Sequence, residues 1–168
     1  MSGKGLNYEI EKIKSYLSRR LKYSEVEFYG RVYKNPTKND NGKAIPEVYT
    51  GAKEYKEVLT NDLNNGIVFF TDSSQHTSVN ALEMQTDVSV VFILNLSKIK
   101  GDFTRQDSEV QTEVLHHLMA LKQFENLSLT IGLDALNEFD TSQIKLSDMQ
   151  PWHVFSIKGK IKYNINNC

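Results

Sequence analysis

Two groups of residues in this chain carry side chains that could support catalysis or metal binding. Glu113 and His116 have the Glu-x-x-His spacing that places both side chains on one face of a helix, as in di-iron helical bundles. Such sites also need carboxylates from other long helices, which this sequence does not predict. Glu113 and His117, one helical turn apart, more simply predict a solvent-exposed pair.

A polar loop holds the second group, which consists of Asp72, Ser73, Ser74 and His76. Residues this close in sequence rarely reach the geometry of nucleophile, base and orienting group, and no nucleophile elbow surrounds either serine. The sequence also lacks Gly-x-Gly-x-x-Gly, a Walker sequence and Cys/His ligand pairs. We therefore expect no catalytic residue, no metal and no cofactor, and we interpret the loop as polar surface.

Length and charge narrow the classes of protein to consider. The 168 residues fit a single domain over 1–168. The formal net charge of -1 calls for neither nucleic acid nor an anionic membrane. No run approaches about 18 apolar residues, and residues 1–6 lack the apolar core of a signal peptide. The lone cysteine, Cys168, fits a chain made in a reducing cytoplasm. We expect no membrane segment.

Hydrophobic periodicity in the first half predicts a helix and a long hairpin. Leu6, Ile10, Ile13, Leu17 and Leu21 recur at helical spacing, and Asn7 is the expected N-cap. From residue 25 the period changes to two, and a turn-rich run at 35–42 separates it from a return strand at 45–49. We expect a protruding hairpin arm over about 25–50. Residues 54–63 predict a short helix or turn.

The second half predicts further strands around one helix. Strands are expected at 67–70, 86–96 and 127–133, with a polar loop at 71–85. A helix over 104–122 would begin at Thr104 as N-cap, with Asp107 at N3. Val110, Val114, Leu118 and Leu121 form its apolar stripe. Together these elements predict an α+β domain: a mostly antiparallel sheet with two helices packed on one face.

The last strand shows the clearest alternation in the chain. Apolar residues occupy one face and polar residues the other: Phe155, Ile157, Gly159, Ile161, Tyr163 and Ile165 against Ser156, Lys158, Lys160, Lys162 and Asn164. We expect one face to be buried and the other open to solvent. Trp152 and His153 precede this alternation, and we expect them to anchor the start of the strand, with a hydrogen-bonded histidine ring nitrogen.

Two sets of exposed residues are candidates for an interface. Lys158, Lys160 and Lys162 could track a phosphate backbone, although the favoured interpretation is either a guard against unwanted strand pairing or simply a solvated face. Tyr29, Arg31, Tyr33 and Tyr49 lie on the expected outer face of the hairpin. Exposed tyrosines on an arm favour a protein interface. The alternative is that they cover the sheet or a helix.

The order of elements resembles the tail-terminator and tail-completion proteins of tailed bacteriophages, a family of small neck proteins. The resemblance covers most of the chain and rests on these segments: the helix at 6–21, the hairpin at 26–49, the strand at 86–96, the capped helix at 104–122, and the closing segment from Trp152-His153-Val154-Phe155 to Ile165. The chain departs from that pattern in its long polar loop at 71–85 and its added stretch at 134–150.

This resemblance implies a structural virion protein, made in the host cytoplasm. Such a protein forms a ring of its own copies, usually six, on the end of the tail tube. The ring caps the tube and joins it to the head connector, so the tube protein and the connector or neck proteins would be partners. DNA would pass through the lumen without sequence-specific binding. The family implies no catalytic residue to carry over.

Three other hypotheses stay open on the sequence alone. A connector, stopper or collar ring of a phage or phage-like injection system would share this architecture. A monomeric immunity-like or adaptor-like module would share the exposed aromatic residues and the lack of chemistry. A hydrolase would use the 72–76 loop or the Glu113/His116 pair.

Overall fold

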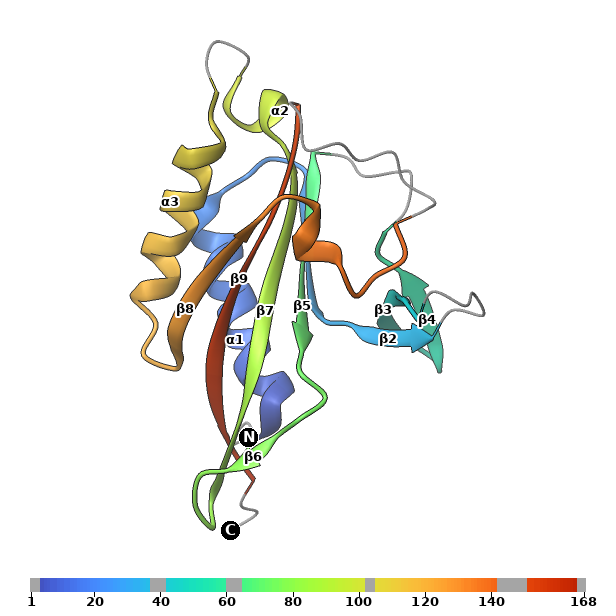
Figure 1. Ribbon diagram of the computed structural model, residues 1–168, viewed down its shortest axis with the longest axis vertical. Helices are drawn as coiled ribbons and strands as arrows, with labels where there is room; N and C mark the ends of the chain where they lie inside the picture. Colours follow the sequence, from blue (N-terminus) through green and yellow to red (C-terminus); the bar gives the residue numbers. More distant parts are fainter. Residues whose placement is uncertain (1–3, 37–41, 60–64, 102–104, 142–150, 166–168) are drawn as a thin grey trace.

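A six-stranded sheet forms the centre of the molecule (Figure 1). The computed structural model describes residues 4–36, 42–59, 65–101, 105–141 and 151–165. The strand order is β1-β5-β7-β9-β8, and β6 pairs with β7 beyond this path. The bounds are β1 Val26–Arg31, β5 Gly66–Asp72, β6 Thr77–Ser78, β7 Glu83–Asn95, β8 Phe124–Ile131 and β9 Trp152–Asn164. All pairs are antiparallel except β1 with β5, which confirms the predicted α+β class.

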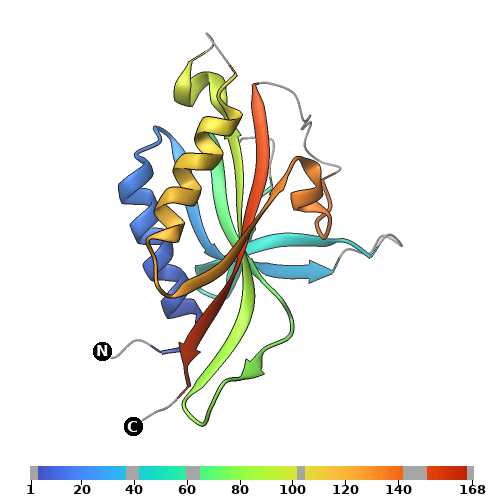
Figure 2. The same ribbon diagram turned by 60° about the vertical axis from the view of Figure 1, so that its left-hand side comes forward.

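Two helices cover one face of this sheet, as Figure 2 shows. They are α1, Gly5–Leu21, and α3, Asp107–Met119; the short α2, Leu96–Lys100, follows β7. The predicted apolar stripes of α1 and α3 are buried in the core between helices and sheet, except that Leu121 is only partly buried. A leucine or isoleucine at every third or fourth position leaves one continuous face that water cannot reach.

The predicted helix caps differ from the structure. The residue at the N-cap of α1 is Lys4 rather than Asn7, so Asn7 lies inside the first turn. The residue at the N-cap of α3 is Gln106, which places Asp107 at the first helical position rather than at N3. Thr104 lies outside the described residues. Asp107 still stabilises the helix start, because a carboxylate there faces the positive end of the helix dipole.

Strands β7 and β9 form the central spine of the molecule. They pair over their full lengths, with Val90 opposite Ile157 and Phe92 opposite Phe155. The rings of Phe92 and Phe155 stack with centroids 4.7 Å apart. The alternation predicted for the last strand is confirmed on this face, because Phe155, Ile157 and Ile161 are fully buried under the helices.

The opposite face of the spine is only partly open, contrary to the expectation of a solvated face. At one end Phe69, Val91, Ile93 and Val154 form a second core with Phe139, which follows the short helix η1, Leu133–Leu136. Ser156 is buried there too. Solvent reaches this face further along β9, where Lys158 and Lys162 are exposed. The unbroken apolar run of β7 explains the difference, because it buries both of its faces.

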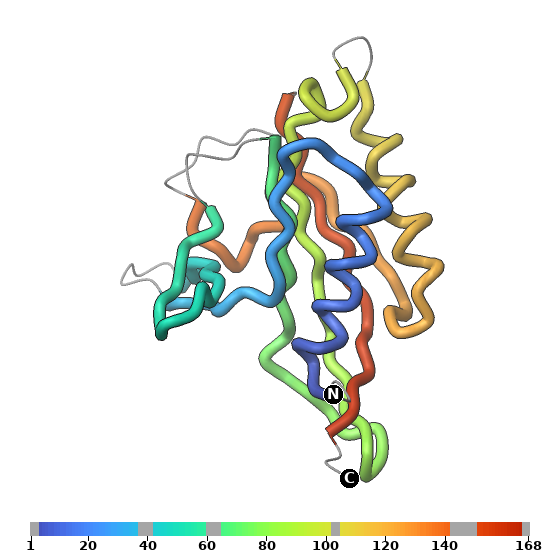
Figure 3. The backbone as a smooth tube through the Cα atoms, turned by 180° about the vertical axis from the view of Figure 1, so that it is seen from behind, coloured from blue at the N-terminus to red at the C-terminus, as the bar shows by residue number. Residues whose placement is uncertain are grey.

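A second sheet, called here the arm sheet, projects from the main body (Figures 1 and 3). Its strand order is β2-β3-β4, with bounds Tyr33–Pro36, Ala44–Gly51 and Glu54–Glu57. The predicted hairpin is therefore confirmed for β2 and β3 but wrong for its first half, since β1 pairs in parallel with β5. The helix or turn expected at 54–63 is wrong for residues 54–57, which form β4. Residues 37–41, at the predicted hairpin tip, lie outside the described ranges.

The break between β1 and β2 occurs at Val32. This side chain is buried in the second core, and its backbone nitrogen donates to the Phe70 carbonyl at 2.8 Å. The arm sheet is held at a second point by Ala44, whose nitrogen donates to the Glu138 carbonyl at 2.9 Å and whose carbonyl accepts from Asp140 nitrogen at 2.8 Å. Two backbone attachments fix the position of the arm sheet on the body.

None of the helices in the described ranges combines the length and the apolarity that a membrane crossing requires.

Candidate functional site: the tyrosine cluster of the arm sheet

Three tyrosines share one face of the arm sheet. Tyr49 lies directly opposite Tyr55 across β3 and β4, and Tyr33 lies opposite Glu47, which is two residues before Tyr49. Because side chains alternate along a strand, this register brings Tyr33, Tyr49 and Tyr55 together. Their ring centroids are 5.5 Å apart for Tyr33 and Tyr55, and 5.3 Å apart for Tyr49 and Tyr55. These three residues are called here the tyrosine cluster.

The tyrosine cluster is exposed although its rings touch. The exposed fractions of Tyr33, Tyr49 and Tyr55 are 53%, 60% and 54%. Tilted rings at these separations attract one another beyond simple area burial. Each ring is held by its neighbour and keeps an open side, so a partner could bury a large aromatic area with little loss of side-chain entropy.

A hollow of about 370 Å³ lies where the tyrosine cluster meets the main body. Besides the tyrosines, its wall includes Asn7 of α1, then Arg31, Val32 and Lys34 around the β1–β2 junction, Asp72 at the end of β5, and Ser74 in the loop that follows. This volume is at the lower end of the range of about 300–1,000 Å³ typical of ligand clefts. The hollow therefore suits a few side chains of a partner better than a large cofactor.

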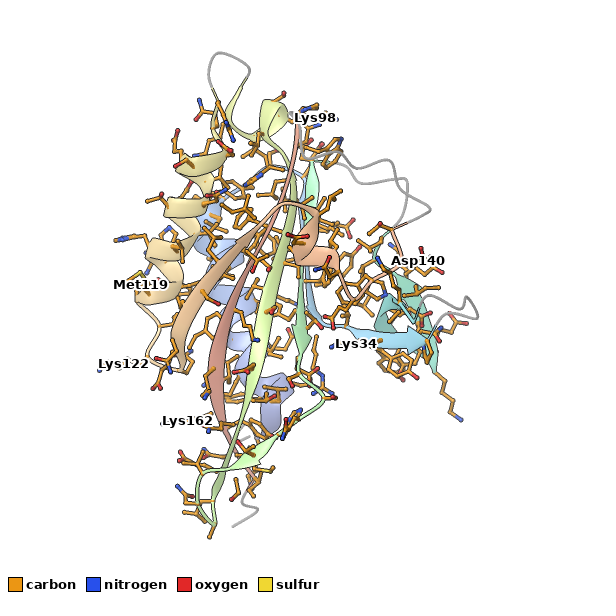
Figure 4. The ribbon with its side chains drawn as sticks, viewed as in Figure 1. Lys34, Lys98, Met119, Lys122, Asp140 and Lys162 are labelled. Atoms are coloured by element: carbon orange, nitrogen blue, oxygen red, sulfur yellow. The ribbon has the colours of Figure 1, made fainter. Side chains whose placement is uncertain are left out.

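Charged groups at the hollow are unequally paired. Lys34 Nζ donates to the Asp72 carbonyl at 2.7 Å and to Glu138 Oε2 at 3.0 Å, and Figure 4 shows Lys34 at the base of the arm sheet. Arg31 is paired more loosely, with its Nε 3.8 Å from Asp72 Oδ1 and its side chain 36% exposed. Lys34 is thus mainly a structural tether, while Arg31 is held by a longer contact with Asp72 and keeps more of its side chain open to solvent.

The polar loop after β5 forms a structural network. Nε2 of His76 lies 2.9 Å from Asp72 Oδ2, and its Nδ1 lies 2.6 Å from the Tyr163 hydroxyl. Burial raises the pKa of Tyr163. Both ring nitrogens of His76 are engaged, and Ser73 Oγ accepts from Gln75 nitrogen at 3.1 Å. The arrangement ties the loop to β9 rather than activating a serine, which needs a free histidine nitrogen.

The carboxylate of Glu113 does not pair with His117, contrary to the expected surface pair. Its Oε2 accepts from the Tyr23 hydroxyl at 3.0 Å and lies 3.0 Å from Lys100 Nζ. Burial, and then the Glu113 carboxylate, raises the pKa of Tyr23. His117 instead meets Tyr16 edge to face, with ring centroids 6.3 Å apart. Within the described ranges, no three His, Cys, Asp or Glu side chains gather as a metal site would require.

Tyr29, expected beside Tyr33 and Tyr49, lies apart from them. It belongs to β1 in the main sheet, where it packs against the second core and its hydroxyl donates to Glu27. Burial, followed by the hydrogen bond to that carboxylate, raises the pKa of Tyr29 to about 12. The alternative interpretation, that a tyrosine simply covers the sheet, holds for Tyr29. It does not hold for Tyr33 and Tyr49.

The three lysines of β9 lie among opposite charges. Lys160 is directly opposite Asp87 on β7 and Glu125 on β8, and Lys158 Nζ lies 4.0 Å from Asp87 Oδ2. Such cross-strand pairs neutralise the row locally, which argues against a phosphate track. The guard interpretation does not fit Lys158 and Lys160, because β9 is paired with both β7 and β8 there, but beyond Ile161 the strand is paired with β7 alone. Lys162, like Lys158, is exposed to solvent.

Trp152 and His153 occupy the two faces of the start of β9. Trp152 is half-buried and packs against the second core. His153 is buried on the helix side, where it stacks on Phe155 and its Nε2 lies 2.8 Å from Nε2 of Gln111 on α3. The expected hydrogen bond of the histidine ring is present, and it links β9 to α3.

Tyr55 and Lys34 are the residues of this site that the sequence interpretation missed. Tyr55 belongs to β4, which was expected to be helix or turn. The sequence does contain a signal for a β3–β4 hairpin: β3 ends at Gly51 and β4 begins at Glu54, so only Ala52 and Lys53 separate the two strands. The turn is hard to recognise from sequence, because Ala52 and Lys53 occupy its two positive-φ positions, where Asn-Gly is the usual pair.

No model of a protein family matches the chain, and no curated protein matches its sequence.

Proposed function

We propose that this chain is a structural subunit of a ring at the tail or neck of a tailed phage. The ring would cap the tail tube and join it to the head connector, which would place the chain in the virion. The observation that carries the proposal is the tyrosine cluster, three exposed and mutually packed rings on a sheet that projects from the body. Tyrosines held in this way are typical of residues that dominate protein interfaces.

The rest of the fold supports an assembly role over catalysis. Two helices cover one face of the main sheet. The main sheet ends in β1 and β8, and the free edge of such a strand can accept a further strand from a neighbouring copy. The residues with catalytic potential, His76 and Glu113, are engaged in contacts between elements of the fold. We assign the chain no enzymatic activity and no cofactor.

A ring whose two sides differ would explain how the tail tube is capped. Copies that meet through two different surfaces close into a ring when the rotation between neighbours allows it. One side of the ring would contact the tail tube protein and the other the connector, so the tube's own repeat surface would not be presented again. DNA would pass through the lumen without sequence-specific contacts. The near-neutral chain and the paired lysines of β9 agree with that expectation.

Another connector or collar ring would use the same surface and differ only in its layer in the neck. A monomeric partner-binding module, immunity-like or adaptor-like, is the alternative that the tyrosine cluster also favours. Oligomeric state separates this module from both rings, because the module would keep a single copy in solution at every concentration.

The direct test of the site is to replace Tyr49 and Tyr55 by serine together and measure mass by analytical ultracentrifugation. We expect the variant to lose assembly while keeping the melting temperature of the wild type, because both side chains are more than half exposed. Tyr29→Phe is the matched control and should assemble normally. Unchanged assembly of the double variant would remove the tyrosine cluster from the interface.

A further inference from the structure

A second concave surface lies on the outer side of α1, beside the turn that joins α3 to β8. Its volume is about 440 Å³, and Tyr8, Tyr16 and Leu121 give it apolar walls. Lys12 and Arg19 add positive charge to the same walls. From Tyr8 to Arg19 the surface follows α1 for about 16 Å, or three helical turns. It is called here the α1 groove. Figure 3 shows α1 and α3 side by side, away from the arm sheet.

The two tyrosine rings of the α1 groove are held by contacts within the chain. Lys12 Nζ lies 4.7 Å from the ring centroid of Tyr8. The guanidinium carbon of Arg20 lies 5.4 Å from the ring centroid of Tyr16, and His117 meets the same ring edge to face. A cation over an aromatic face attracts the ring electrostatically, so both rings are oriented before a partner arrives. Rings that are already oriented lose little entropy when an apolar side chain packs against them.

Positive charge remains at the α1 groove after the ion pairs within α1 are formed. Both carboxylates of α1 are paired with a lysine of the same helix at 2.9 Å: Glu9 with Lys12, and Glu11 with Lys14. In the part of the chain that the structure describes, Arg19 and Arg20 form no ion pair, and Arg19 Nε donates instead to the Ser15 carbonyl at 3.2 Å. The C-terminal end of α1 offers only about half a negative charge. The two guanidinium groups therefore keep an uncompensated positive charge.

This distribution of charge favours an acidic protein segment over a nucleic acid. A nucleic acid lays a phosphate beside every nucleotide, whereas Arg19 and Arg20 stand together at one end of the α1 groove. The carboxylate of Glu11 also lines the groove and disfavours a phosphate backbone, while a peptide can place a neutral side chain beside it. One face of each tyrosine ring already carries a cation, which leaves less surface for stacked bases. A membrane surface does not fit, because the apolar stripe of α1 is buried in the core.

We propose that the α1 groove binds an acidic amphipathic helix of another protein. Carboxylates of that helix pair with Arg19 and Arg20, because a guanidinium group can donate two parallel hydrogen bonds to a carboxylate. Its apolar side chains pack between Tyr8 and Tyr16 and against Leu121, as in other helices that lie in a groove. Within the described residues, a second copy of this chain offers no such helix, since α1 and α3 both bury their apolar stripes. The inference is independent of the proposed ring, which uses the tyrosine cluster.

A designed peptide measures this binding without knowledge of the natural partner. The probe is a fluorescein-labelled peptide of about 14 residues, which as a helix covers the α1 groove at about 1.5 Å per residue. It contains glutamate, alanine and leucine, with the leucines three and four residues apart so that they share one face. In one comparison peptide alanine replaces leucine, and in the other lysine replaces glutamate. Fluorescence anisotropy with the full-length protein should show that each comparison peptide binds at least about tenfold more weakly than the probe.

Substitutions at exposed residues test the protein side of the contact. Arg19→Gln combined with Arg20→Gln removes both uncompensated cations and should weaken binding of the probe at least about tenfold. Tyr8→Ser removes one apolar wall and should weaken it about fivefold. Lys56→Gln combined with Lys98→Gln is the matched control, because it removes two exposed cations from other elements. This control should bind the probe as the wild type does, and circular dichroism confirms that each variant is folded.

The outcomes distinguish this inference from nucleic-acid binding and from the proposed ring. If the probe does not bind the wild type, or binds the double arginine variant equally well, the inference is overturned. Tighter binding of an oligothymidine of about ten nucleotides than of the probe also overturns it and assigns the α1 groove to nucleic acid. Binding of the probe is measured whatever the oligomeric state, so a monomeric wild-type chain that binds it would contradict the ring and support this inference.

Discussion

The rings of Tyr33 and Tyr55 meet with their centroids 5.5 Å apart, although they come from the two edge strands of the arm sheet. Tyr49, on the central strand between them, completes the cluster. The contact spans the full width of the arm sheet on one face. The position of β4 therefore decides whether the cluster exists, and the short turn between β3 and β4 sets that position.

The first prediction concerns this turn. Ala52 and Lys53 adopt φ of 51° and 64°, in the left-handed region where a β-carbon costs about 1 kcal/mol or more per residue. Replacing them with Asn and Gly should stabilise the fold by about 1 kcal/mol in urea unfolding. Lys56→Gly, in strand β4, is the control and should destabilise by about 0.5–1 kcal/mol. If the Asn-Gly variant is less stable than the wild type, backbone strain at Ala52 and Lys53 does not reduce the free energy of unfolding.

A second prediction concerns Trp152. Its half-buried ring covers the second core, so Trp152→Ala should lower the free energy of unfolding by about 2–3 kcal/mol, below the ~3–5 kcal/mol of a fully buried aromatic residue. Chemical denaturation measures this. Leu133→Ala, at a residue 37% exposed, is the comparison and should cost clearly less. An unchanged melting temperature for Trp152→Ala would reject its role as an anchor.

A third prediction concerns Gly159 in the middle of β9. A β-carbon added there would lie 2.5 Å from Phe124 Cε2 and 2.6 Å from Leu127 Cδ2, closer than carbon atoms approach in folded proteins. Gly159→Ala should therefore destabilise by about 1–3 kcal/mol, despite the higher strand propensity of alanine. Lys158→Ala, the exposed neighbour on the other face, should change stability little. Equal stabilities of the two variants would contradict this packing.

A fourth prediction concerns pH and the contact between Tyr23 and Glu113. Burial and the neighbouring carboxylate raise the pKa of Tyr23 above its ordinary value of 10.0, so the folded state prefers the neutral phenol. The resulting stability is fully present below pH 10 and is lost as pH rises above it. Urea unfolding at pH 8 and at about pH 11 should show a smaller alkaline loss for Tyr23→Phe than for the wild type. Parallel losses in both proteins would remove Tyr23 as the cause.

Hydrophobic periodicity correctly predicted those helices and strands that carry a complete apolar face within their own sequence. The stripe from Leu6 to Leu21 and the alternation from Phe155 to Tyr163 each carry a full apolar face, so their structures were predictable without knowledge of a partner. The same alternation could not show what covers the other face. The clue lay in β7, where Val91 and Ile93 interrupt the alternation and indicate burial on both sides.

The split hairpin shows why the site itself was only half predictable. Tyr33 and Tyr49 were expected together because β2 and β3 are joined by turn-forming residues. The pairing of β1 with β5 depends on contacts distant in sequence, and Val32 changes sheets because the second core buries it. Tyr29 was therefore misplaced. Tyr55 was missed because non-glycine residues at positive φ give no turn signal.

The measurement that most directly tests the central claim is the solution mass of the purified wild-type chain by light scattering, with negative-stain images of the same peak. We predict a mass that is a fixed multiple of 19.3 kDa, six being the number that the family resemblance implies, and closed rings with a central opening. A single species of 19.3 kDa at every concentration, with no rings in the images, would contradict the account.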